Sequence, residues 1–356
     1  MESVTDTVST IVEPERDLAS IFNSAIAATA ISAAWEVGLL DELKEQRNVD
    51  LHKFAIQNDL DIGSMQGLVT ALAIVNVVQH EQNTIRPGRL LDEAYRTKSL
   101  FHWLTLGSGG LFSRMQYLLR NENRTGDFYQ RDPVAIAYAC QDINREHFDP
   151  VFWTAMAGLD YKFQSVADLG SGTGERLMKI LDRYPGTTGI GIDLAGPAVK
   201  VAAAEALKRG FGDRLFFKEG DVREIEHDVD YAQIDLLTCF MMGHDFWPRD
   251  NCVATLQQLR KAFPKVRRFF LGDTTRILLG NAQSKYAINE NNVPIFTLGF
   301  EFGHAMMGVY LPTMEEWEGV FVESGWRCTR KHLVGSPSLS VIFELEHASL
   351  QINPSL

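Results

Sequence analysis

The stretch that decides the fold is DLGSGTGE, residues 168–175. It follows the apolar run 165–169 and precedes a helical pattern over 175–184, so it predicts a glycine-rich turn between a strand and a helix. A turn in this setting is typical of a loop that binds a nucleotide or nucleoside. Asp193 stands at the end of the next predicted strand, where its carboxylate can accept both hydroxyls of a ribose.

Outward from this loop, apolar runs of strand length alternate with helical patterns such as 196–209. The runs cover residues 165–169, 188–193, 215–217, 234–240 and 268–271, with a last strand at 338–346. This alternation predicts an α/β fold with a Rossmann-like, doubly wound sheet of parallel strands.

The N-terminal part has a different pattern. Helical periodicity over 18–43, 51–57 and 67–79 is followed by a short hairpin at 77–87, which predicts a mostly helical, winged-helix-like domain. The chain thus divides into a domain at 1–157 and a cofactor-binding domain at 158–356. The stretch 67–75 carries no Lys or Arg for a DNA groove, so dimerisation and covering of the active site are the expected roles. The broad apolar surface of the first helix predicts a homodimer.

Composition narrows the function further. The 356 residues have a formal net charge of −12, which argues against a partner bound through nucleic-acid phosphates. The four cysteines form no CxxC pair, the N-terminus has no secretory pattern, and no run of 18 apolar residues suggests a membrane span. We therefore expect a cytoplasmic protein with reduced thiols. A non-catalytic DNA-binding regulator remains as an alternative class.

The glycine spacing and the neighbouring charges select the cofactor. Dinucleotides favour GxGxxG, whereas this loop reads GxGxG with Asp168 before it and Glu175 after it. Negative charge at both edges repels a pyrophosphate and suits a ligand with an ammonium and a sulfonium, which S-adenosyl-L-methionine carries. Asp221, after the third strand, can accept a hydrogen bond from the adenine amino group. The predicted cofactor-binding residues are Asp168, Gly170, Gly172, Gly174, Asp193, Asp221, Val222 and Phe240.

With these motifs, residues 165–345 resemble a class I S-adenosylmethionine-dependent methyltransferase. The whole chain is similar to the two-domain small-molecule O-methyltransferases, and the segment LPTMEEW at 311–317, followed by Gly325-Trp326, is similar to the one these enzymes carry before their last hairpin.

The stretch FMMGHDFWP, residues 240–248, follows the fourth strand and should face the ligand cleft. His244 there could be a general base oriented by Asp245, a metal ligand, or a structural histidine. A second histidine, His304, lies in the Gly- and Met-rich segment 300–308 and could complete an open metal site, which its spacing from His244 alone does not establish.

The pattern Met241-x-x-His244-Asp245 with a later histidine resembles the 2-oxo acid C-methyltransferases, which include phenylpyruvate and 2-ketoarginine methyltransferases. This resemblance implies a divalent or ferric ion, iron or zinc-like, on His244 and His304, with Asp245 holding metal-bound water or moving a proton. It also implies pocket roles for Trp103, Ser108 and Arg131, with Met241 as a further substrate contact and Arg131 as a candidate catalytic residue.

The expected reaction is methylation of the β-carbon of a 2-oxo acid through a metal-chelated enolate, since that carbon becomes nucleophilic after losing a proton. The alternative is a metal-free O- or N-methyltransferase with His244 as base. The acceptor's side chain stays open between two pockets. An acidic pocket could use Glu301, Asp273 and Asp132, and an aromatic one could use Phe246, Trp247, Phe296, Phe300 and Phe302.

Overall fold

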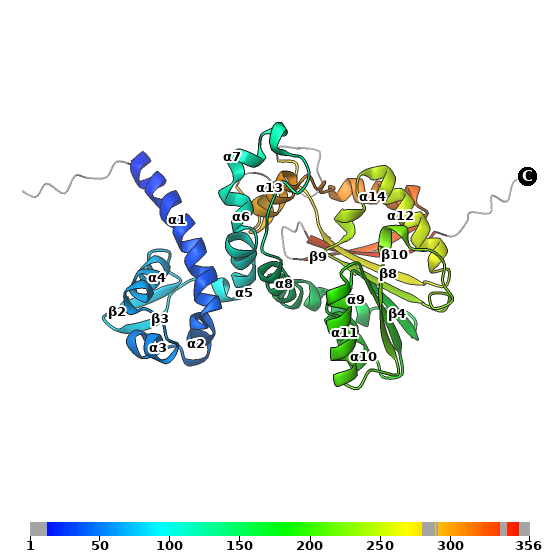
Figure 1. The fold of residues 1–356 in the computed structure, drawn as a ribbon, viewed down its shortest axis with the longest axis horizontal. Coiled ribbons are helices and arrows are strands. Elements are labelled where there is room, and N and C mark those ends of the chain that lie inside the picture. Colours follow the sequence, from blue (N-terminus) through cyan, green and yellow to red (C-terminus); the bar gives the residue numbers. More distant parts are fainter. Residues whose placement is uncertain (1–12, 280–288, 290, 335–339, 349–356) are drawn as a thin grey trace, which may run out of the picture. The chain divides into compact units, whose positions relative to one another are not determined.

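The computed structural model describes residues 13–279, 289, 291–334 and 340–348 (Figure 1). The chain divides into two compact units, Met1–Glu146 and His147–Leu356. This boundary lies before the expected one at 157/158, because helix α9 (Asp149–Ala157) belongs to the second unit. Asp149 of α9 forms ion pairs with Arg176 and Lys179, and Phe152 packs edge-on against Phe240.

The first unit is mostly helical with one small sheet. Its strands are β1 (Val49–Asp50), β2 (Val78–Glu81) and β3 (Thr84–Pro87), in the order β1-β3-β2. The hairpin β2–β3 is antiparallel, as the sequence predicts. The helices are α1 (Glu13–Glu36), α2 (Leu39–Gln46), α3 (Leu51–Gln57), α4 (Ile62–Ile74), α5 (Leu91–His102), α6 (Gly109–Ser113), α7 (Met115–Leu118) and α8 (Pro133–Ile143), with a π-helix η1 (Trp103–Gly107) and a 3-10 turn η2 (Asn121–Asn123).

Helix α1 is mostly apolar from Leu18 onward but buried only in its C-terminal half. Ala27, Ala30, Ile31, Ala34 and Trp35 enter the core of the first unit, while the large apolar side chains before Ala27 are exposed. By length and composition alone α1 could cross a membrane, and it is the single helix among the described residues that meets this test. The pattern over 18–43 predicts one helix, but the structure has two. α1 ends at Glu36, and Gly38, with a left-handed φ of 80°, is the N-cap of α2.

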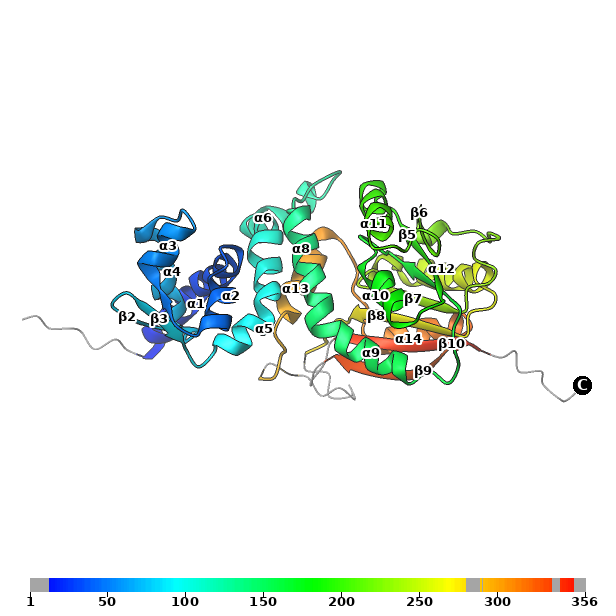
Figure 2. The ribbon, with the colours of Figure 1, turned by 90° about the horizontal axis from the view of Figure 1, so that it is seen from below.

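The second unit has the doubly wound sheet that the sequence predicts. Its order is β6-β5-β4-β7-β8-β10-β9, and Figure 2 shows β6 and β9 on opposite sides of the sheet. The first five of these strands are parallel, and β10 runs antiparallel to both β8 and β9. The strands are β4 (Ser165–Leu169), β5 (Thr188–Asp193), β6 (Leu215–Glu219), β7 (Leu236–Phe240), β8 (Arg268–Thr274), β9 (Trp326–Val334) and β10 (Ser340–His347).

Helices connect and cover these strands. They are α9, α10 (Glu175–Arg183), α11 (Gly196–Lys208), α12 (Arg249–Ala262), α13 (Thr297–Met307) and α14 (Met314–Glu323), with short turns η3 (Asn144–Phe148), η4 (Val222–Glu224) and η5 (Gly243–Phe246). In Figure 1, α9, α10 and α11 lie on one side of the sheet, and α12 and α14 on the other. β4 and β7 are buried at every position, as expected for central strands that are covered on both faces.

Candidate active site

The glycine loop joins β4 to α10 with a backbone that side chains would disturb. Gly170, Gly172 and Gly174 have φ angles of 71°, 52° and 74°, in the left-handed region that glycine adopts without strain. A Cβ at Gly174 would lie 2.3 Å from the Phe217 ring, whereas a Cβ at Gly172 would meet no atom within 4 Å. Gly172 therefore faces open space, where a ligand can approach the backbone closely.

Asp168, the last-but-one residue of β4, is a buried carboxylate. Its Oδ1 accepts a hydrogen bond from Thr238 Oγ1 at 2.6 Å, and burial raises the pKa of Asp168 to about 6 against the opposing charge of Arg176. Asp193 is half-buried and accepts from the backbone N–H groups of Gly172 (2.7 Å) and Ala195 (2.8 Å). Asp193 thus shapes the glycine loop in addition to its predicted ribose contact.

Asp221, Val222 and Phe240 lie at the ends of the next strands. Asp221 begins η4 and binds the guanidinium of Arg223 at 2.6 Å, which lowers the pKa of the Asp221 carboxyl. Val222 is buried. Phe240 ends β7, and the Arg176 guanidinium carbon lies 3.6 Å from the centre of its ring. The structure thus brings the predicted cofactor residues together at the carboxyl ends of the parallel strands, where ligands bind in such folds.

His244 lies in η5, immediately after β7, and Asp273 of β8 holds it. The backbone N–H of His244 donates to Asp273 Oδ2 at 2.7 Å, and its ring Nδ1 lies 2.9 Å from Asp273 Oδ1. Asp273 is fully buried, and its Oδ1 also accepts from the backbone of Thr274. Because the carboxylate accepts, Nδ1 carries the proton and the lone pair of the neutral ring lies on Nε2.

This contact corrects one expectation. Asp245 does not orient the His244 ring; Asp273 does, while Asp245 is exposed and its backbone N–H bonds to Met242. From the sequence alone, Asp273 is assigned only to an acidic substrate pocket. The signal that could have identified its role is that it lies near the end of β8, the strand next to β7, and His244 follows β7. Met241, a predicted substrate contact, has a φ of 55°, a conformation rare for a side chain of its size.

His304 of α13 lies beside His244. The two ring centres are 5.0 Å apart with the planes at 84°, and His304 Nδ1 donates to the Phe300 carbonyl at 2.7 Å. In both rings Nδ1 is therefore the donor, and the lone pair of the neutral ring lies on Nε2. Two imidazoles that each bind one ion through Nε2 at about 2.0 to 2.1 Å have ring centres roughly 5 Å apart when the ligand–metal–ligand angle is near tetrahedral.

This pair therefore fits two ligands of an open metal site. Within the described residues, no group of three His, Cys, Asp or Glu side chains could hold an ion, so further ligands would be water or substrate.

The three substrate residues predicted in the first unit also lie close together. Trp103 begins the π-helix η1 and Ser108 follows its end, and π-helical turns are frequent at functional sites. Both are buried, and the Ser108 hydroxyl has no hydrogen-bond partner among the residues that the structure describes. The backbone N–H of Asp132 donates to the Gly107 carbonyl, which places Arg131 next to this turn. Arg131 forms no ion pair with any described residue.

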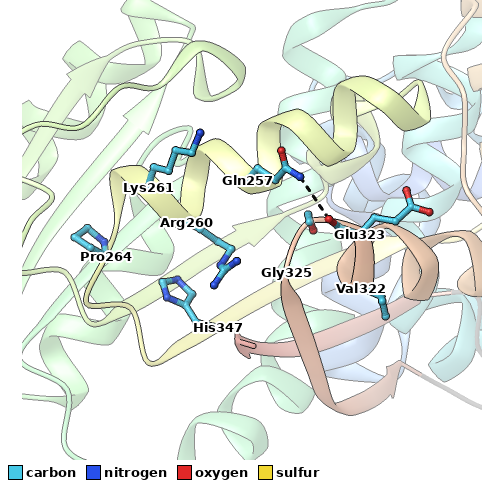
Figure 3. Close-up of a pocket in the computed structure, with 9 residues that line it drawn as sticks. Gln257, Arg260, Lys261, Pro264, Val322, Glu323, Gly325 and His347 are labelled. Carbon is cyan, nitrogen blue, oxygen red and sulfur yellow. Dashed lines mark hydrogen bonds between the residues drawn. The ribbon is translucent and has the colours of Figure 1, made fainter. Parts of the chain in front are cut away.

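The second unit has a separate pocket, shown in Figure 3, at the opposite ends of the parallel strands. It is formed where α12 and α14 end, and Arg260, Lys261 and His347 are among its lining residues. α12 starts after His244 and runs back toward the start of β8, so its last turn is at the amino ends of the parallel strands. Arg260 and Lys261 lie in the last turn of α12, where the negative end of the helix dipole favours cations. This pocket is therefore not part of the candidate active site.

Comparisons with known proteins agree with this geometry. Residues 166–264 match the family model of a methyltransferase domain. The chain is 66% identical over 336 residues to "Methyltransferase ungE'" of Aspergillus campestris, covering 94% of this chain and 98% of that one. It is 26% identical to an indolepyruvate C-methyltransferase of Streptomyces griseus, covering 90% and 92%.

Among solved structures, human N-acetylserotonin methyltransferase in complex with S-adenosylmethionine superposes with a TM-score of 0.63 at 15% identity, covering 96% of this chain and 99% of that one. This likeness covers the helical unit as well as the sheet. The glycine loop, the sheet order and these matches together establish that the chain belongs to the class I S-adenosylmethionine-dependent methyltransferases.

Proposed function

We propose that this methyltransferase transfers a methyl group to the β-carbon of a 2-oxo acid with an aromatic side chain. The observation that carries the proposal is the pair His244 and His304, whose ring centres lie 5.0 Å apart and whose Nδ1 atoms are both engaged, which leaves Nε2 as the nitrogen suited to bind a metal. An O-methyltransferase needs one base, whereas carbon methylation needs help in acidifying a C–H bond. The similarity to an indolepyruvate C-methyltransferase supports the same class of acceptor.

His244 and His304 would hold the ion, and Asp273 would fix the tautomer and direction of His244. When bound, such a cation supplies Lewis acidity that makes the carbon next to a ketone easier to deprotonate. The residues of the chain do the rest. The exposed carboxylate of Asp245 takes the proton from the β-carbon. That carbon then forms a C–C bond to the methyl group as the C–S bond breaks and S-adenosylhomocysteine leaves.

The surroundings of the two histidines favour an aromatic acceptor over a cationic one. The three acids considered for a cationic side chain are engaged elsewhere: Asp273 holds His244, Asp132 caps α8, and Glu301 accepts from the backbone N–H of Ile277. Phe300 lies 4.0 Å from His304 and 5.8 Å from His244 between ring centres, and Phe296 lies 5.0 Å from Phe300.

The remaining aromatic candidates differ in their contacts. Phe246 is part of the hydrophobic core, and Trp247 packs against Tyr310 and Trp317. An aromatic wall beside the histidines is therefore formed by α13 and the residue before it.

The alternative is a metal-free O- or N-methyltransferase. The His244–Asp273 pair favours it, because a buried carboxylate on Nδ1 strengthens Nε2 as a general base. In that case His304 would have no part in the chemistry.

The test is a methylation assay with S-adenosylmethionine and phenylpyruvate, indolepyruvate or 2-ketoarginine, together with metal analysis of the purified protein. We expect a product that is heavier by one methylene and whose new methyl group couples to the proton on C3 in NMR spectra. Activity should fall at least 100-fold with a chelator and in both His244→Ala and His304→Ala, and return when the chelated wild type receives iron or zinc.

His332→Ala is the matched control, because His332 also pairs with a carboxylate, Glu344, but lies on β9 away from this pair. Full activity after chelation, with loss in His244→Ala but not in His304→Ala, would select the metal-free alternative. Full activity in both histidine variants would refute both functions.

We also propose that the enzyme is a homodimer. On α1, Leu18, Ile21, Phe22 and Ile26 expose 54 to 71% of their surface, at the spacing of one helix face. A second copy is the proposed cover. Sedimentation should give a dimer that Phe22→Glu converts to a monomer, and a monomeric wild type at micromolar concentration would contradict the proposal.

A further inference from the structure

Arg176, the second residue of α10, is a nearly buried arginine that follows the glycine loop. Its Nη1 lies 3.2 Å from Asp149 Oδ1, and its side chain is 9% exposed. The guanidinium carbon lies 3.6 Å from the centre of the Phe240 ring and 5.0 Å from that of Phe152. The side chain therefore connects α9, the start of α10 and the end of β7.

An arginine is not expected at this place on local grounds. The first turn of a helix favours acidic groups, because its free N–H groups form the positive end of the helix dipole. Burial also disfavours the charged guanidinium and lowers the pKa of Arg176, against the charges of Asp168 and Asp149. One partner is already sufficient for Asp149, since Lys179 binds its Oδ2 at 3.0 Å. The buried cation therefore needs an explanation besides its ion pair with α9.

Asp168 provides this explanation. It lies in the strand before the glycine loop, paired with Thr238 of β7, whose hydroxyl donates to its carboxylate. Thr238 and Phe240 are two residues apart in β7, so their side chains lie on the same face of the sheet, and the Arg176 guanidinium that stacks on Phe240 lies on the face of the Asp168 carboxylate.

The other charged group that acts on Asp168 is Asp193 of β5, with the Cys239 thiol of β7 also nearby. Burial and Asp193 raise the pKa of Asp168, while the charge of Arg176 and the hydrogen bond from Thr238 lower it. Arg176 is the one cation among these groups, and it favours the carboxylate form.

We propose that Arg176 is a positioning residue of the cofactor site that keeps Asp168 ionised, so that a carboxylate meets the ammonium group of S-adenosylmethionine. The stack on Phe240 and the ion pair with Asp149 hold the guanidinium in place for this role. The inference uses the predicted role of Asp168 in cofactor binding and is independent of the acceptor and of the metal. Its failure would leave the proposed carbon methylation untouched.

The test measures the affinity for S-adenosylhomocysteine by calorimetry between pH 5.5 and 8. Arg176→Gln removes the charge but keeps a planar polar group, and Arg176→Lys keeps the charge. Removing a nearby cation raises the pKa of a buried carboxyl by roughly one to two. We therefore expect Arg176→Gln to bind roughly 5- to 50-fold more weakly than wild type at pH 6 and within about twofold at pH 8, whereas Arg176→Lys should follow the wild-type profile.

Two controls separate this role from a structural one. 5′-Methylthioadenosine has the adenosine and the thioether but no ammonium or carboxylate, so its affinity should not change in Arg176→Gln at any pH. Arg183→Gln removes an exposed arginine of the same helix, stacked on Trp153, and should bind both ligands as wild type does. If Arg176→Gln does not fold, Arg176→Met serves as the charge-free variant. An equal loss for both ligands, a loss that is the same at all pH values, or no loss would overturn the proposal.

Discussion

Asp273 is the residue whose replacement tests the candidate active site most directly. It is fully buried and accepts three N–H groups: the backbone N–H of His244 at 2.7 Å, that of Thr274 at 2.8 Å, and Nδ1 of His244 at 2.9 Å. Asp273→Asn keeps the size but replaces one acceptor oxygen by an NH2 donor. In one orientation the NH2 group opposes the backbone N–H of His244, and in the other it opposes Nδ1.

The expected cost follows from these contacts. Losing a charge-assisted hydrogen bond and opposing at least one buried donor destabilises the fold by about 1.5 to 3 kcal/mol. Where the NH2 group faces Nδ1, the ring must move its proton to Nε2, which removes the lone pair needed for a metal or for a base. Loss of an orienting partner of this kind typically lowers metal affinity or activity roughly 10- to 100-fold.

Asp245→Asn is the matched comparison, because Asp245 is adjacent to His244 in the chain but exposed. Its free energy of unfolding in urea should change by less than about 0.5 kcal/mol. Methyl transfer should fall in both variants, because Asp245 is the proposed proton acceptor, so unfolding is the measurement that distinguishes them. Binding of S-adenosylhomocysteine should be unchanged in both. The role given to Asp273 would be refuted if Asp273→Asn folds, keeps kcat within twofold of wild type, and has an unfolding free energy within about 0.5 kcal/mol of wild type.

Four further outcomes are expected. Asp168→Asn should weaken S-adenosylhomocysteine binding, yet it should stabilise the ligand-free protein against urea unfolding by about 2 to 3 kcal/mol above pH 6. Folding raises the pKa of Asp168 from 3.8 to about 6, so this gain in stability should vanish as the pH falls below 4. A gain that stays constant across this pH range would contradict the prediction. Ser108→Ala removes a buried hydroxyl without a partner among the described residues, so it should raise the unfolding free energy by about 1 kcal/mol and raise KM for the acceptor; a lower stability would argue that the hydroxyl is satisfied. Lys98→Met breaks the buried Lys98–Asp142 ion pair, at 3.2 Å, and should destabilise the first unit by about 3 kcal/mol in thermal or urea unfolding, while Lys53→Met, an exposed lysine, should be neutral. The imidazole of His347 should titrate near pH 4 in NMR spectra, because burial and the charge of Arg260 lower its pKa to about 4, and Arg260→Gln should move this midpoint upward; an unchanged midpoint would exclude the influence of Arg260.

The fold could be predicted where local pattern and tertiary structure agree. The predicted runs at 165–169 and 188–193 coincide with β4 and β5. These two strands could be predicted because each is a short apolar segment that is bounded by turns and buried on both faces of the sheet. α13 could not be recognised as a helix in this way. It contains Gly299 and Gly303, each of which disfavours a helix by about 1 kcal/mol, so packing decides its conformation.

The contacts of the candidate site follow a similar division. The glycine loop and Asp193 are adjacent in the chain to the strands they follow, so sequence spacing was sufficient. The His244–Asp273 contact depends on the register of β7 and β8, in which Phe240 pairs with Gly272, so that the turn after Phe240 passes beside Asp273. No local pattern encodes that register. The approach of His304 to His244 depends in turn on where α13 packs, which the family resemblance implied and spacing could not.

The candidate cofactor site contains buried charges, those of Asp168 and Arg176, that disfavour the ligand-free fold. Asp168 is ionised in a buried place at a cost of about 3 kcal/mol above pH 6, and Arg176 offsets part of the cost while being disfavoured by burial itself. A ligand that brings its own cation to Asp168 removes much of this imbalance. Because binding of its ammonium group favours the ionised carboxylate, the stabilisation of the second unit by S-adenosylmethionine should decrease as the pH falls below about 6, whereas stabilisation by an analogue without the ammonium should not. The cost of the buried carboxylate is in this sense part of the selectivity for a cationic cofactor, because a phosphate-bearing nucleotide would meet the same charge as repulsion.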